Sequence, residues 1–221
     1  MSDDLQHRPA LADPDVWIKA GVKANGFEHC EMVLVHVDDV MVISETPSRT
    51  VDGIKSVFKL KGDAAGPPDV HLGVTLEKKT NSQETKCWTM SPEKCVDAAV
   101  KNVEEKLAKD GLRLPNKCPT PMVGDYHPSD DVSAELTAVG LHCYQELIGV
   151  LRWAVEIGRL DILLEVALLS THLALPRQGH LEQVHHIFGC LKQSPRRRMH
   201  LNTDWPTMSE ERFTKCEWTD L

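Results

Sequence analysis

The sequence predicts an α+β fold, with a small antiparallel sheet and packed helices first and a three-helix subdomain later. Two observations carry this prediction. Short β-branched and apolar runs, separated by turn signals, dominate the chain up to Ser91. Beyond Ala138, apolar residues recur instead at helical spacing. No internal repeat is present, so we expect one strand-rich part and one helical part.

The strands are expected in five runs, bounded by turn signals. Asn25-Gly26 is a hairpin signal between the first two runs, and Pro47 with Ser48 opens a helix after the third. Gly66-Pro67-Pro68 then breaks the chain before the last pair. The expected strands are 16–22, 30–37, 40–44, 70–77 and 84–91, of which the first three form a meander.

The helices follow from apolar periodicity. A helix after Pro92, stopped by Gly111, is expected to pack on the sheet. Residues 112–138 are rich in Pro, Asp and Ser and predict a crossing loop, which we take as the main boundary. Three helices are then expected at 144–157, 161–173 and 178–192. The predicted parts are therefore 1–111, the crossing loop 112–138, a helical subdomain 139–194 and a linker 195–221.

Composition restricts the class of protein. The 221 residues are 41% hydrophobic and 26% charged, which indicates a globular chain. The start has no signal-peptide pattern, and seven scattered cysteines indicate reduced thiols, so we expect an intracellular protein, cytoplasmic or nuclear and not secreted. Charges interrupt the most apolar region, so no membrane span is expected. The oligomeric state stays open.

Two adjacent carboxylates, Asp38 and Asp39, lie between the apolar runs of "VLVHVDDVMVIS". An exposed hairpin turn is one explanation, because Asp is common in tight turns. A divalent cation is the other, because carboxylate oxygens are the ligands that Mg²⁺ or Mn²⁺ prefers. The pair by itself does not decide between a plain turn and a metal site.

Further motifs give this pair a context. "HVDD" at His36–Asp39 matches, apart from its first residue, the "YVDD" of copia-type LTR retrotransposon reverse transcriptases. "DPDVW", "HLGVTLE", "CPTPM" and the block from Tyr144 to Lys192 are similar to further stretches of that family, in the same order. The sequence thus resembles the C-terminal palm and thumb part of such a polymerase, from about Asp13 to Lys192. The resemblance implies that the linker leads toward the family's RNase H domain, which we expect to begin beyond "EWTDL" and to be absent from these 221 residues.

The resemblance implies RNA-directed DNA synthesis, a nucleotidyl transfer that uses two Mg²⁺ (or Mn²⁺) ions, a primer-template and dNTP. Asp38 would be a principal catalytic metal ligand with Asp39 beside it, and His36, in place of the tyrosine, would lie near the primer terminus. The family adds a catalytic aspartate and nucleotide-gripping residues from earlier segments, and none of these is recognised before Asp38. We therefore expect weak metal binding and no activity of the chain alone. The alternative is a non-catalytic nucleic-acid-binding or decayed remnant of a transposable element.

Other residues have competing interpretations. Lys192 and Arg196–Arg198 could bind template phosphates, although a solvated charge run is the simpler reading and the net charge of −8 opposes binding to a polyanion. Asp13 and Asp15 are expected to serve in a turn and at the start of a strand. His186 and Cys190 have a spacing that a metal could bridge, but no second ligand pair is apparent, so we expect packing rather than zinc.

Overall fold

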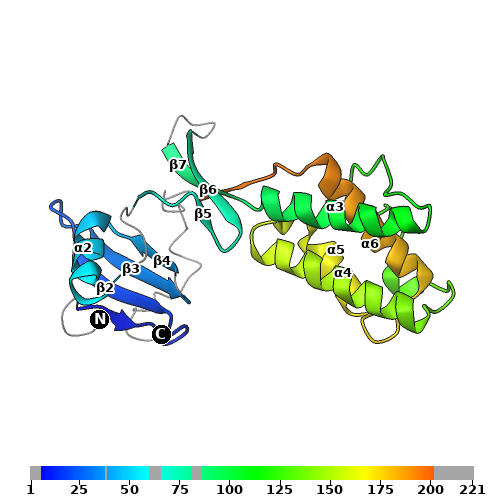
Figure 1. The fold of residues 1–221 in the computed structure, drawn as a ribbon, viewed down its shortest axis with the longest axis horizontal. Helices are drawn as coiled ribbons and strands as arrows, with labels where there is room; N and C mark the ends of the chain where they lie inside the picture. The colour runs from blue at the N-terminus through cyan, green and yellow to red at the C-terminus, as the bar shows by residue number, and fades with distance from the viewer. Residues whose placement is uncertain (1–5, 38, 60–65, 81–85, 202–221) are drawn as a thin grey trace, which may run out of the picture. The chain divides into compact units, whose positions relative to one another are not determined.

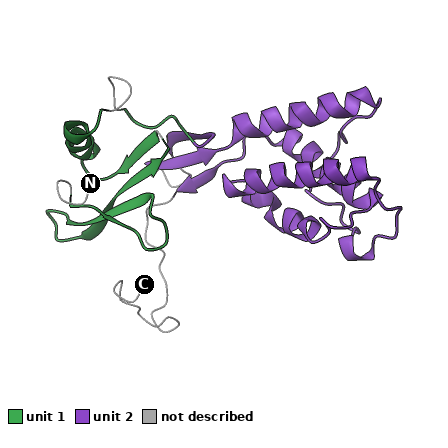
Figure 2. Ribbon diagram, turned by 60° about the horizontal axis from the view of Figure 1, so that its bottom comes forward, with its two compact units in different colours: residues 1–71 green, residues 72–221 purple. Residues whose placement is uncertain are grey.

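The computed structural model describes residues 6–37, 39–59, 66–80 and 86–201. Its described part is α+β, with two small antiparallel sheets and five α-helices, which confirms the predicted fold class. The chain divides into two compact units, residues 1–71 and 72–221, coloured green and purple in Figure 2.

The first unit is built on a four-stranded antiparallel sheet. Its strands lie in sequence order and are β1 (Arg8–Pro9), β2 (Val16–Val22), β3 (Glu28–His36) and β4 (Asp39–Ile43). Asn25-Gly26 forms the β2–β3 turn, where Gly26 has φ +81° and the amide of Lys23 donates to the carbonyl of Phe27 at 2.8 Å. The predicted meander is therefore confirmed, with β1 added at its edge.

Helix α2 (Pro47–Val57) follows β4 and packs beside it (Figure 1). Pro47 is at the start of the helix, where its missing amide hydrogen costs nothing. The helix buries Thr50 and Ile54, and Val33 is the fully buried residue of β3. The small core of this unit therefore lies between one helix face and the middle of the sheet.

A second antiparallel sheet contains β6 (Val74–Thr80), β7 (Lys86–Ser91) and β8 (Met199–Leu201). The expected strand 70–77 is divided into β5 (Val70–His71) and β6, because Leu72 and Gly73 have φ +50° and +82° and form a turn. β8 comes from the predicted linker and pairs with β7, with His200 opposite Thr89. The sheet of the second unit thus joins segments far apart in the sequence.

Four helices form the core of the second unit. They are α3 (Glu93–Lys109), α4 (Ala138–Glu156), α5 (Leu163–Ser170) and α6 (Gln178–Gln193), and a 3₁₀ helix, η2 (Leu160–Ile162), precedes α5. The last three confirm the predicted helices, and α3 contacts α4, α6 and β6. One apolar cluster joins all four helices, and its fully or almost fully buried members include Val96, Tyr144, Leu151, Leu169, Ile187 and Phe188.

The crossing loop packs on the helices through specific hydrogen bonds. Ser133 Oγ accepts from the amide of Gly179 at 2.9 Å, and Arg177 Nη1 donates to the carbonyl of Ser133 at 2.6 Å. His180 is buried, and its Nε2 lies 2.9 Å from the carbonyl oxygen of Pro128, in the 3₁₀ helix η1 (Pro128–Asp130). The crossing loop and the helices therefore lie in the same compact unit. That these segments correspond to parts of a polymerase stays a prediction.

Candidate functional site

The hairpin that joins β3 and β4 is very tight. Val35 pairs with Val40 and His36 with Asp39, so the turn between the strands is two residues long. Val37 has φ +54°, and its side chain is 89% exposed. A β-branched side chain is disfavoured at positive φ, since its Cβ crowds the backbone. The tip is therefore an exposed turn that carries local backbone strain.

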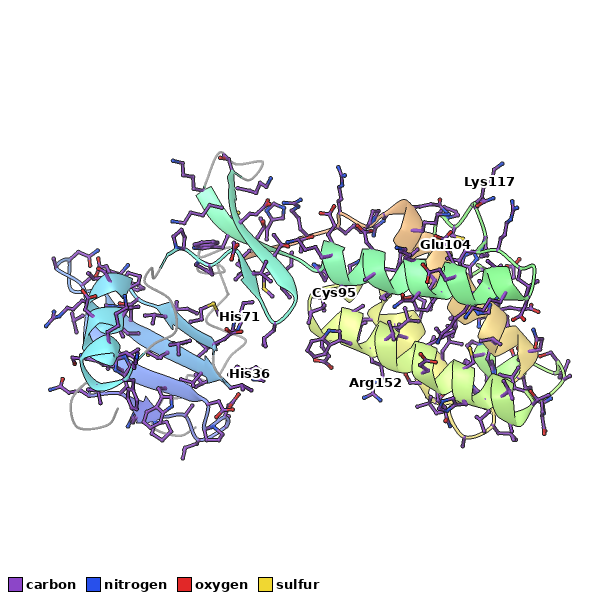
Figure 3. All side chains as sticks on the ribbon, viewed as in Figure 1. His36, His71, Cys95, Glu104, Lys117 and Arg152 are labelled. Carbon is purple, nitrogen blue, oxygen red and sulfur yellow. The ribbon has the colours of Figure 1, made fainter. Side chains whose placement is uncertain are left out.

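Two of the predicted site residues, His36 and Asp39, lie in this hairpin. Asp39 is the first residue of β4, and its side chain is exposed opposite that of His36. Figure 3 shows His36 at the end of β3, on the rim of the sheet. Asp38 lies outside the described residues. The structure thus brings His36 and Asp39 together, and the role of the acidic pair stays a prediction.

Asp13 and Asp15 lie just before β2. The Oδ1 of Asp13 accepts from the amide of Asp15 at 2.9 Å, which closes a local turn. The carbonyl of Asp15 accepts from the amide of Val35 at 2.9 Å. Both residues therefore have the turn and strand-start positions expected for them, and Asp15 lies at the hairpin end of the sheet.

The predicted metal ligands can be judged by their donor atoms and by their number. Carboxylate oxygens suit Mg²⁺ or Mn²⁺, and the exposed carboxylate of Asp39 loses little hydration when it binds an ion. Within the described ranges, no group of three or more His, Cys, Asp or Glu side chains is arranged to hold a metal ion. The donor type therefore fits Mg²⁺, whereas one carboxylate pair is a small ligand set for an octahedral ion, which would keep most of its water.

His186 contacts two residues of the crossing loop. His186 Nδ1 lies 3.6 Å from Cys118 Sγ, and its Nε2 lies 3.0 Å from the carbonyl oxygen of Thr120. Cys118 and Cys190 are buried, and burial followed by the nearby Cys190 raises the pKa of the Cys118 thiol. These contacts hold the crossing loop on α6. The sequence could not show that Cys118 belongs to this cluster, because it lies 68 residues away from His186.

The predicted nucleic-acid-binding cations are all engaged by carboxylates of the second unit. Lys192 Nζ lies 2.7 Å from Glu104 Oε1 and lines an open cavity of about 440 Å³ together with Arg113 and Asn116. Arg196, Arg197 and Arg198 pair with Glu93, Asp161 and Glu77, respectively. Sequence reasoning missed these acidic partners. The positive charge that the segment offers to a phosphate is therefore reduced in this conformation.

Comparisons with known proteins give no match. No family model matches the chain, and no curated protein or solved structure is significantly similar to it. None of the described helices is long and apolar enough to cross a membrane.

Proposed function

We propose that this chain is part of the polymerase domain of a copia-type LTR retrotransposon reverse transcriptase, an RNA-directed DNA polymerase. The observation that carries the proposal is the β3–β4 hairpin. It presents Asp39, exposed at the start of β4, beside a turn in which Val37 has φ +54°. His36, Val37 and Asp39 of the motif "HVDD" lie in this hairpin. A chain of this origin would act inside the cell on a primer-template and dNTP.

The strain at the tip supports a functional turn over a plain one. Residues with positive φ in tight hairpins are normally Gly, Asn or Asp, because their side chains tolerate the left-handed region. The β2–β3 turn of the same sheet follows this rule, with Gly26 at φ +81°. Val37 departs from it. Strained residues of this kind cluster at functional sites, where other interactions fix the backbone.

Asp38 and Asp39 are the residues that would hold the metal. When bound, Mg²⁺ ions in such an enzyme stabilise the attacking and leaving oxygens of the nucleotidyl transfer. The contribution of this chain is to fix the carboxylates, since Asp39 begins a strand that pairs with β3 along its whole length. His36 lies opposite Asp39 and would contact the primer end, as the resemblance implies.

A non-catalytic nucleic-acid-binding or decayed remnant is the second candidate. The small ligand set at the hairpin favours a chain without catalysis. The pairing of Lys192 and the three arginines with carboxylates favours the decayed form over the nucleic-acid-binding form. Both candidates share the polymerase lineage. They differ in whether the acidic pair still binds a metal ion.

The test is a Mn²⁺ titration of the 221-residue chain, followed by electron paramagnetic resonance of free Mn²⁺. We expect one weak site that Asp38→Asn and Asp39→Asn each weaken at least tenfold, since each removes a charged ligand. Asp13→Asn is the matched control, because Asn keeps the Oδ1 acceptor of the local turn. Equal binding by the wild type and the double Asn variant would overturn the metal-site proposal.

A further inference from the structure

Three consecutive arginines after α6 each bind a different element of the second unit. Their partners begin α3, lie in η2 and lie in β6. The hydrogen bonds are Arg196 Nε to Glu93 Oε1 at 3.0 Å, Arg197 Nη1 to Asp161 Oδ2 at 3.1 Å and Arg198 Nη1 to Glu77 Oε2 at 2.9 Å. Figure 1 shows this segment in orange as it runs from α6 to the sheet.

The three pairs differ in exposure. The Arg196 side chain is 80% exposed, so its pair with Glu93 contributes little to stability. The Arg198 side chain is only 24% exposed. Arg197 shares the carboxylate of Asp161 with the buried Arg159, which fixes the position of that carboxylate. The inner two pairs therefore anchor the segment more firmly than the outer one.

The anchored segment leads directly into β8. Met199 follows Arg198 and pairs with Met90, and Leu201 pairs with Trp88. His200 Nδ1 lies 3.6 Å from the buried Cys87 Sγ. β8 is only three residues long, and so short a strand has little stability of its own. The ion pairs immediately before β8 are thus well placed to hold it against β7.

The same guanidinium groups are the strongest phosphate-binding candidates in the sequence. A guanidinium N–H that donates to a carboxylate must give up that bond to donate to a phosphate with the same hydrogen. Nucleic acid offers a dense row of phosphates, and the release of its counterions favours binding at low salt. Carboxylates and phosphates therefore compete for these three side chains.

We propose that Arg196–Arg198 form an electrostatic clasp that holds β8 on β7, and that a nucleic-acid backbone opens it by taking the arginines from Glu77, Glu93 and Asp161. Only the choice of nucleic acid as the competing polyanion rests on the proposed function. In the closed clasp the arginines are engaged within the chain. When the clasp opens, β8 is released.

The first test is hydrogen exchange of the full chain without nucleic acid. The double variant Glu77→Gln/Glu93→Gln keeps the side-chain shapes but removes the charge of two partners. We expect the β8 amides to exchange about threefold faster than in the wild type, because partly exposed ion pairs stabilise only modestly. Glu105→Gln is the matched control, because among the described residues Glu105 pairs with Lys101, on the exposed face of α3. Unchanged exchange in β8 would overturn the clasp.

The second test adds a short DNA duplex at low salt. We expect the double variant to bind about tenfold more tightly than the wild type and with a steeper salt dependence, because more arginines reach phosphates. We also expect the duplex to accelerate β8 exchange in the wild type. Equal affinities, or β8 protection by the duplex, would overturn the competition. The metal proposal is tested separately, at the hairpin of the first unit, so the two can fail independently.

Discussion

The guanidinium of Arg159 is fully buried and binds the carboxylate of Asp161 through two hydrogen bonds, Nε to Oδ1 at 2.8 Å and Nη2 to Oδ2 at 2.9 Å. Its Nη1 is buried and has no hydrogen-bond partner among the described residues. Asp161 is therefore the main compensation for this buried charge. The pair fixes the chain between α4 and α5 and, through Arg197, the segment before β8.

Loss of the Asp161 charge should destabilise the second unit. Asp161→Asn leaves a buried guanidinium without its counter-charge, a change that costs about 3 kcal/mol of unfolding free energy. Urea denaturation at neutral pH measures the effect. Asp97→Asn on the exposed face of α3 is the control and should change stability by less than about 0.5 kcal/mol. A similarly small effect of Asp161→Asn would contradict this role.

The same pair predicts a pH dependence. Burial raises the pKa of Asp161, but the hydrogen bonds and charges of Arg159, followed by Arg197, outweigh burial, so the pKa lies below its ordinary value. A lowered folded-state pKa stabilises the protein above the unfolded pKa of about 3.9, and this stability is lost as the pH falls through the folded value. Between neutral and acidic pH, the unfolding free energy of Asp161→Asn should therefore fall less steeply than that of the wild type. If the unfolding free energy of both proteins changed with pH along parallel curves, Asp161 would be excluded as the source of the pH dependence.

Two helical glycines should respond oppositely to alanine. A Cβ on Gly189 in α6 would lie 2.8 Å from both Cys118 Sγ and the Pro115 carbonyl oxygen, whereas a Cβ on Gly149 in α4 meets nothing within 4 Å. Gly149→Ala should stabilise the chain by about 1 kcal/mol through helix propensity. Gly189→Ala should destabilise it by about 1–3 kcal/mol through overpacking. Thermal unfolding of both variants checks this, and equal shifts would show that the crossing loop does not pack on α6.

The strain at the hairpin should be measurable. Val37→Asn places a residue that tolerates positive φ at the tip and should slow exchange of the β3 and β4 amides by a factor that corresponds to about 1 kcal/mol. Val40→Asn is the control within the strand, where Val40 pairs with Val35, and should have the opposite effect. Faster exchange in Val37→Asn would mean that the valine side chain stabilises the turn.

The 221-residue chain by itself should not extend a primer. Transition-state stabilisation by two metal ions needs both ions positioned before attack, and Asp38 with Asp39 is the carboxylate pair that the motif supplies. Primer extension on a homopolymer RNA template with Mg²⁺ or Mn²⁺ should show no difference between the wild type and Asp38→Asn. Robust extension that Asp38→Asn abolishes would show that a further residue, with Asp15 the first candidate, completes the site.

Local signals in the sequence predicted most of the fold. Apolar periodicity located α4 and α6, and Asn25-Gly26 located the β2–β3 turn. Contacts between distant residues could not be read in this way. Nothing near Arg197 indicates that its partner is Asp161, 36 residues away, because a charge pattern gives no tertiary distance. The turn at Leu72 was also missed, since positive φ at leucine has no propensity signal, although the following Gly73 permitted it.

The central claim is that the β3–β4 hairpin is a carboxylate metal site of polymerase origin. Paramagnetic broadening of backbone amide resonances by substoichiometric Mn²⁺ tests it most directly, because broadening falls steeply with distance from the ion. We predict that the strongest broadening centres on His36 to Val40 and disappears in the double variant Asp38→Asn/Asp39→Asn, while Asp13→Asn retains it. Broadening that is centred elsewhere, or that survives in the double variant, would contradict the claim.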